Sequence, residues 1–276
     1  MSAPYASARP PLSHQAHQDP IRKRRPMKTT LTLATAAALG GLALAAASNG
    51  SNPPAPIVEG AVTGHVKFEG TPPETKPLAI TEEKAKGCCP AGKTMDTTDP
   101  TLVVSKDGGI ANVVITIDVP GSKVEPAAEA IHVDQKMCRF EPHVRVLPEG
   151  GKVVFLNSDE VSHNVHTYAT KNDTFNKTIA PGSKEEQTLA KGDKITVKCD
   201  IHDWMSAVVF VTDTPFYAVT AEDGSFSIKG LKPGKYKAEL WHEKLGKEKA
   251  EVVVKEDGSC DPLEIKMGEK KKGGKK

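Results

Sequence analysis

Short β-prone runs separated by turn residues follow one another along most of this chain, and they restrict the fold more than any other feature. We assign strands to residues 61–68, 102–104, 113–117, 131–133, 143–146, 153–156, 163–167, 195–198, 207–211, 216–220, 225–228, 236–241 and 249–254. Pairs such as Asp223-Gly224 and Pro233-Gly234 stand between these runs and favour tight turns. Because no amphipathic helical pattern of any length is present, the sequence predicts an all-β protein.

The N-terminus has the features of a secretory signal peptide. Basic residues within 22–28 precede the apolar run 31–46, and Ala45-Ala46-Ala47 offers a cleavage site. We therefore expect residues 1–47 to be removed, with Met27 as an alternative start and Arg24-Arg25 as a weak twin-arginine alternative. A membrane anchor is the competing interpretation, but the apolar run is short for a span. The mature protein is expected in the periplasm or another extracytoplasmic space.

Charge is distributed unevenly along the chain. Residues 48–265 carry 25 Lys and Arg against 33 Asp and Glu, whereas the leader and the Lys-rich tail 268–276 are basic. Residues 48–58 have the composition of a flexible linker. A mildly acidic globule with a basic tail argues against nucleic acid as a partner. No later apolar run is long enough for stable membrane insertion, and we expect a monomer.

A thiolate, an imidazole and a thioether donor occur at three-residue spacing in Cys199, His202 and Met205, directly after a β-prone run. A second imidazole, His163, lies upstream in Ser162-His163-Asn164-Val165-His166. Two imidazoles and one thiolate in a plane, with a weak axial methionine sulfur, form a mononuclear copper site of the blue electron-transfer type. We predict that His163, Cys199, His202 and Met205 hold one Cu(II)/Cu(I) ion.

Other histidines near this motif are expected to have structural roles. Strand alternation should turn His166 away from His163, so we predict that it is not a ligand. His143 is interpreted as a packed or surface residue. Trp204 and Ile201 allow two interpretations, either ordinary packing or an apolar rim around the ligand loop. His242 begins a partial zinc-protease motif, which we reject because Gly246 occupies the position of the second ligand.

Four cysteines remain once Cys199 is assigned to the metal. In an oxidising compartment they are expected to form disulfides. A bond between the neighbours Cys88 and Cys89 is geometrically awkward. We therefore expect these two to pair separately with Cys138 and Cys260, and a redox or metal pair at Cys88-Cys89 is the alternative.

Residues 129–212 resemble the cupredoxins, especially their amicyanin-like members. The resemblance rests on the strands before Asn157, on His163-Asn164-Val165-His166, and on the short Cys199-x2-His202-x2-Met205 loop. It implies a Greek-key β-sandwich with the four ligands named above. It also implies that Asn164 supports the ligand loop through hydrogen bonds.

A second resemblance covers the flanks of that segment. Residues 223–228 and Gly230-Leu231-x-Pro233-Gly234-x-Tyr236 are similar to carboxypeptidase-regulatory-like, or transthyretin-like, sandwiches, and residues 64–70 are similar to their first strand. This implies a second, smaller β-sandwich module made of residues 59–128 and 213–267, with the cupredoxin segment inserted. Two sequential domains and one enlarged sandwich are the alternatives.

These features together predict an exported one-electron carrier with a type 1 copper centre. No enzymatic activity is expected, because such a metal has no open position for a substrate. Electrons are expected to pass through an exposed edge of His202, where a redox partner protein would dock. The alternatives are copper storage or delivery, and a structural or adhesion protein with a cupredoxin insert.

Overall fold

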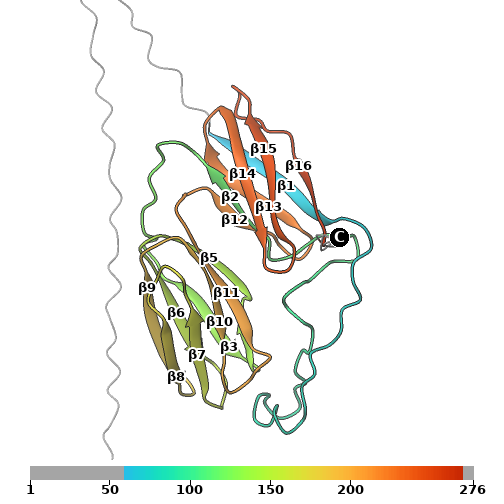
Figure 1. Cartoon of the computed structure of the whole chain (residues 1–276), viewed down its shortest axis with the longest axis vertical. Coiled ribbons are helices and arrows are strands. Elements are labelled where there is room, and N and C mark those ends of the chain that lie inside the picture. Colours follow the sequence, from blue (N-terminus) through green and yellow to red (C-terminus); the bar gives the residue numbers. More distant parts are fainter. Residues whose placement is uncertain (1–58, 270–276) are drawn as a thin grey trace, which may run out of the picture. The chain divides into compact units, whose positions relative to one another are not determined.

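The computed structural model describes residues 59–269, and every regular element within that range is a β-strand (Figure 1). The sixteen strands are β1 (Gly60–Phe68), β2 (Val114–Asp118), β3 (Ile131–Lys136), β4 (Arg139–Glu141), β5 (Val144–Pro148), β6 (Gly151–Asn157), β7 (His163–Tyr168), β8 (Phe175–Ile179), β9 (Lys184–Leu189), β10 (Asp193–Lys198), β11 (Ser206–Thr212), β12 (Tyr217–Val219), β13 (Ser225–Leu231), β14 (Gly234–His242), β15 (Gly246–Val254) and β16 (Leu263–Met267). The predicted all-β fold is confirmed over these residues.

The strands β3 to β11 form two sheets that share one core. The five-stranded sheet has the order β5-β11-β10-β7-β8, and the four-stranded sheet has the order β4-β3-β6-β9. Alternate residues of these strands point inward, as expected for facing sheets. The fully buried Phe155, Val165, Ile195 and Val209 are part of the resulting core, which also contains Cys199 and Met205.

The strands at the two ends of the described chain form a second pair of sheets. One has the order β13-β1-β16 and the other has the order β12-β2-β14-β15. Their shared core includes the fully buried Val62, Ile115, Leu240 and Val252. The chain therefore leaves this second sandwich after β2 and returns to it at β12. The predicted domain boundaries and the identity of the second module stay predictions.

A third apolar cluster joins the two sandwiches. It contains Val114 of β2, Val144 and Val146 of β5, and Val208 and Phe210 of β11. The ring of Trp241 in β14 lies 5.7 Å from the ring of Phe210. Strand β11, which directly follows Met205, therefore contributes side chains both to the core of the first sandwich and to the contact with the second sandwich.

Four strands were missed by the sequence prediction, and one predicted strand is absent. Strands β4, β8, β9 and β16 are short, and β8 and β9 lie at sheet edges with mostly exposed, polar residues. Such edges lack the apolar alternation that identifies a half-buried strand. Residues 102–104, predicted as a strand, make only an isolated bridge between Val104 and Ile110.

The segment of residues 69–113 between β1 and β2 contains isolated bridges and turns but no strand. A disulfide links its Cys88 to Cys138, in the turn between β3 and β4. In Figure 1 this segment is the long teal and green loop. Among the described residues, no helix meets the length and apolarity that a membrane crossing requires. The predicted leader and linker, and residues 270–276 of the tail, lie outside the described residues.

Candidate metal centre

The four predicted ligands occupy one end of the first sandwich. His163 is the first residue of β7, Cys199 directly follows β10, and Met205 directly precedes β11. Strands β7 and β10 are antiparallel neighbours, with Lys198 opposite His166. Because of this register, the start of β7 lies beside the end of β10, and His163 meets the Cys199–Met205 loop.

Two backbone hydrogen bonds close the Cys199–Met205 loop. The Met205 amide donates to the His202 carbonyl at 2.9 Å, and the Cys199 amide donates to the Met205 carbonyl at 3.3 Å. Met205 is 1% exposed and packs in the same core cluster as Cys199. A sequence of only seven residues can therefore present three side chains inward from one turn between two strands.

Donor atoms of His163, Cys199 and His202 converge. One ligand atom from each residue lies within 4.8 Å of the others. The Nδ1 atoms of the two histidines are 3.0 Å apart, and the Cys199 Sγ lies 3.7 Å from the His202 Nδ1. All three side chains are buried, with exposures of 0%, 2% and 7%. Two imidazole nitrogens and one sulfur facing a common point fit the donor set of a copper ion. Their assignment as ligands, together with Met205, stays a prediction.

The environment of Cys199 favours the thiolate, which is the form that binds metals. Burial raises the pKa of this thiol, but hydrogen bonds from His163 and His202 outweigh it and lower the pKa to about 6. Because this thiol ionises readily, removing its proton on metal binding costs little free energy.

Asp159 holds the outer edge of His163 and was not identified from the sequence. The Asp159 carboxylate accepts a hydrogen bond from the His163 Nε2 at 2.8 Å. It also accepts the backbone amides of Met137 and Cys138. Burial lowers the pKa of His163, but the hydrogen bonds and negative charges of Asp159 and Cys199 together outweigh it, and the net shift is upward. Because Asp159 keeps a proton on Nε2, a metal that displaces the other ring proton would find the lone pair of Nδ1 directed toward the site.

The turn that donates to Asp159 has an unusual backbone. Met137 and Cys138 both have a φ of 51°, in the left-handed region that non-glycine residues seldom occupy. Two consecutive residues of this kind form the tight turn between β3 and β4. The buried carboxylate offsets the strain by accepting both amides. The only sequence signal for Asp159 is an acidic residue four positions before the predicted ligand His163.

Asn164 supports the ligand loop as the resemblance implied. Its Oδ1 accepts a hydrogen bond from the Asp200 backbone amide, and its Nδ2 donates a hydrogen bond to the Asp200 carboxylate at 3.0 Å. His166 lies on the other face of β7, with its Nδ1 3.1 Å from Asp200 and its ring stacked on Tyr168. The expected alternation of His163 and His166 is therefore observed.

The expected exposed edge of His202 is not present, and that prediction is wrong. His202 is 7% exposed, and its Nε2 lies 3.9 Å from the Sγ of Cys88. The segment of residues 69–113 covers this edge, and Lys84 in that segment forms a 2.8 Å ion pair with Asp203. No motif or periodicity in the sequence indicates that an irregular segment folds over the ligand loop.

Trp204 and Ile201 differ in their surroundings, and the interpretation of an apolar rim stays a prediction. Trp204 is half-buried, and its Nε1 donates to the Cys138 carbonyl at 3.0 Å. Its ring lies 5.1 Å from that of His202. Trp204 therefore packs against the site. Ile201 is 56% exposed and is one of the few large apolar residues at the described surface.

Only one of the two expected disulfides forms. Cys88 pairs with Cys138, whereas Cys89 and Cys260 are free thiols. The expected pairing of Cys89 with Cys260 is therefore wrong. The reason is their location, because Cys89 packs against the core of the first sandwich and Cys260 against the core of the second.

His143 links the ligand-bearing sheet to the second sandwich. Its Nδ1 donates to the Ser206 carbonyl at 3.0 Å, and its Nε2 contacts the Glu243 carboxylate. This confirms the expectation of a packed residue. His242 is 1% exposed, and burial lowers its pKa to about 4. Its neutral Nδ1 accepts the amides of Lys244 and Leu245 and closes the turn between β14 and β15.

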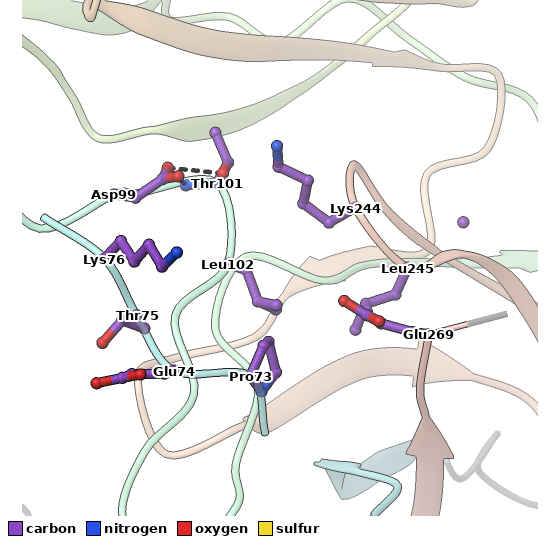
Figure 2. Close-up of a pocket in the computed structure, with 11 residues that line it drawn as sticks. Pro73, Glu74, Thr75, Lys76, Asp99, Thr101, Leu102, Lys244, Leu245 and Glu269 are labelled. Carbon is purple, nitrogen blue, oxygen red and sulfur yellow. Dashed lines mark hydrogen bonds between the residues drawn. The ribbon is translucent and has the colours of Figure 1, made fainter. Parts of the chain in front are cut away.

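A cavity of about 800 Å³ lies elsewhere, and its lining contains none of the four predicted ligands (Figure 2). Its walls carry charges of both signs, including Lys76, Lys244 and Glu269. Asp99, in the same lining, is already engaged by Thr101 at 2.6 Å. We assign no function to this cavity.

No protein-family model and no curated protein matches the chain. Among solved structures, the Cu(I) form of an amicyanin mutant is 23% identical, covering 36% of this chain and 98% of that chain with a TM-score of 0.28. A purple cupredoxin from Nitrosopumilus maritimus is 19% identical, with coverages of 30% and 99% and a TM-score of 0.27. A copper-containing nitrite reductase from Thermus scotoductus is 20% identical, with coverages of 35% and 25% and a TM-score of 0.30.

This chain thus spans only a quarter of the nitrite reductase, but nearly all of the amicyanin and the purple cupredoxin. These structural neighbours are cupredoxins or contain copper, and each is matched over about a third of the present chain. The likeness is low by TM-score in every case. The function proposed below therefore rests on the donor geometry.

Proposed function

We propose that this protein binds one copper ion at His163, Cys199, His202 and Met205 and carries single electrons outside the cytoplasm. The observation that supports this is the convergence of two Nδ1 atoms and one sulfur, all from buried side chains, between the start of β7 and the Cys199–Met205 loop. A bound copper ion would supply the one-electron chemistry by alternating between Cu(II) and Cu(I).

The residues of the chain have distinct roles in this proposal. Cys199 ionises readily and supplies the thiolate, while Asp159 keeps the proton of His163 on Nε2 so that Nδ1 is free. Asn164 fixes the backbone at Asp200, next to the thiolate. A closed β-frame then holds the donors in nearly one arrangement for both oxidation states, which keeps the reorganisation on electron transfer small.

The test is to add Cu(II) to the purified mature protein. We expect an intense visible thiolate-to-copper band that Cys199→Ala abolishes. His166→Ala is the matched control, because this histidine lies on the same strand but faces Asp200. Absence of the band in the parent protein, or its loss in His166→Ala, would show that the ligand set is wrong.

Because His202 is covered, we place the docking surface for a redox partner on the adjacent exposed Ile201. The electron self-exchange rate between two copies reports on this surface without knowledge of the partner. We expect Ile201→Lys to slow self-exchange at least tenfold, through repulsion of like charges at the contact. Val253→Lys, at another exposed apolar residue in the second sandwich, should leave the rate unchanged.

A further inference from the structure

The disulfide Cys88–Cys138 lies against the outer edges of both histidines, on the side away from Cys199. The Cys88 Sγ is 3.9 Å from the His202 Nε2, and the Cys138 Sγ is 3.9 Å from the His163 Nε2. Both cysteines are almost fully buried, at 1% and 0% exposure. Each imidazole therefore has one nitrogen facing the proposed copper position and the other beside a disulfide sulfur.

We propose that Cys88, Cys138 and His202 form a second metal site when this disulfide is reduced, and that it takes a soft d10 cation, Cu(I) or Zn(II). Donor atoms of these three residues already lie within 4.8 Å of one another. Two thiolates and one imidazole suit these cations, which prefer sulfur and nitrogen ligands. We call this the outer site.

The geometry needs little adjustment. Metal–sulfur bonds of about 2.3 Å in a tetrahedral site place two sulfurs about 3.8 Å apart. The two sulfurs are bonded to each other and must separate on reduction, whereas the 3.9 Å from Cys88 Sγ to His202 Nε2 is already close to a ligand–ligand distance. His163 is not needed, because Asp159 engages its Nε2 at 2.8 Å.

The reduction is a thiol–disulfide exchange with a dithiol protein as reductant. One thiolate of the dithiol attacks a sulfur of the Cys88–Cys138 bond and forms a mixed disulfide, and the second thiol then resolves it. Two electrons and two protons pass to Cys88 and Cys138, and the reductant is left as a disulfide. The metal then displaces the two thiol protons, and also the Nε2 proton of His202 when Nδ1 of the same ring already holds the first ion, so that both ions share the imidazolate.

Access to the buried disulfide is through residues 69–113, which we call the covering segment because they lie over His202. Residues 69–113 have no strand, and Cys88 is held locally by a hydrogen bond from its amide to the Ala85 carbonyl. Segments with few backbone bonds open at a lower free-energy cost than the global unfolding of a core. The exposed ion pair between Lys84 and Asp203 adds one contact between this segment and the ligand loop.

The experiment uses the mature chain with Cys89→Ser and Cys260→Ser, which removes the two free thiols outside both sites. The protein is reduced anaerobically with a phosphine, freed of the reductant, and titrated with Cu(I) in competition with a chromogenic chelator, and with Zn(II) in parallel. We expect the oxidised protein to bind one equivalent of Cu(I) and the reduced protein to bind two.

Two variants separate the outer site from the copper site proposed above. Cys199→Ala should leave the reduced protein with one tightly bound ion and the oxidised protein with none. Cys88→Ser/Cys138→Ser should bind a single equivalent under both conditions. An intact Cu(II) charge-transfer band in the double-serine variant shows that it folds. X-ray absorption of the added ion should report two sulfur ligands and one nitrogen.

The inference is overturned if the reduced parent binds only one equivalent, or if the second equivalent persists in the double-serine variant. It does not depend on electron transfer. If no blue band appears with Cu(II) but the reduced Cys199→Ala protein binds one ion through Cys88 and Cys138, the proposed function fails while the outer site stands.

Discussion

The two sandwiches are built from similar sheets but differ in what they bury. The core cluster of the second sandwich is aliphatic and aromatic apart from Met267, and its buried titratable residue is the neutral His242. The first sandwich buries Asp159, His163, Cys199 and His202 together at one end. Buried ionisable groups cost free energy unless they are paired, and such clusters occur preferentially at functional sites, which is the basis for proposing a site in the first sandwich.

The largest effect is expected when one core side chain is removed from each sandwich in turn. Phe155→Ala and Leu240→Ala each delete a fully buried side chain, at a cost of about 2–5 kcal/mol of unfolding free energy. Chemical denaturation measures that loss. We expect the copper band to weaken only in Phe155→Ala. Loss of the band to the same degree in Leu240→Ala would mean that the sandwiches act as a single unit, coupled through the cluster around Phe210.

Asp159→Asn is expected to affect both stability and the metal. The amide cannot replace a carboxylate that accepts two backbone amides and the His163 Nε2, so we expect a loss of about 1–3 kcal/mol. Loss of a buried negative charge beside His163 should also favour Cu(I) and raise the reduction potential, measured by voltammetry.

Asp193→Asn is the matched control. Asp193 is also a buried carboxylate in the first sandwich, and it accepts the amides of Thr170 and Lys171. We expect a similar loss of stability with no change in potential. If both variants shift the potential equally, Asp159 has no special influence on His163.

Much of this organisation follows from local sequence, because alternation and turn chemistry are local. The apolar positions of β10 alternate with the period of a strand, β6 and β11 contain continuous apolar runs, and the spacing of Cys199, His202 and Met205 predicts a donor loop. The polar edge strands β8 and β9 were missed because their stability comes from pairing with β7 and β6 rather than from their own apolar side chains.

The parts of the site that the sequence did not reveal depend on contacts between distant segments. Asp159 matters because a turn with positive φ at Met137 and Cys138 presents two amides to it. The burial of His202 depends on Cys88, which lies far from it along the chain. Neither contact leaves a periodic or motif-like signal near the predicted ligands.

Acid titration should reveal how much the buried Asp193 carboxylate stabilises the first sandwich. Burial raises the pKa of Asp193, but hydrogen bonds from Thr170, Lys171 and Lys194 outweigh it and lower the pKa to about 2. An unfolded aspartate has a pKa of about 3.9. Because the folded pKa is the lower one, the ionised Asp193 adds about 2 kcal/mol to the free energy of unfolding. This contribution is present above about pH 4 and is lost as the pH falls toward 2. Asp193→Asn should therefore flatten the decline in unfolding free energy between pH 4 and 2, and an unchanged slope would contradict this.

The smallest expected effect concerns the covering segment of residues 69–113. Lys84→Ala removes an exposed ion pair with Asp203, and Lys152→Ala removes one with Glu186. Each should change the unfolding free energy by less than about 1 kcal/mol. Only Lys84→Ala should speed amide hydrogen exchange at Cys88, because Lys84 links the covering segment to the ligand loop and Lys152 does not. Equal exchange at Cys88 in both variants would mean that the disulfide alone holds the segment over His202, and reduction would then be the one event that uncovers the site.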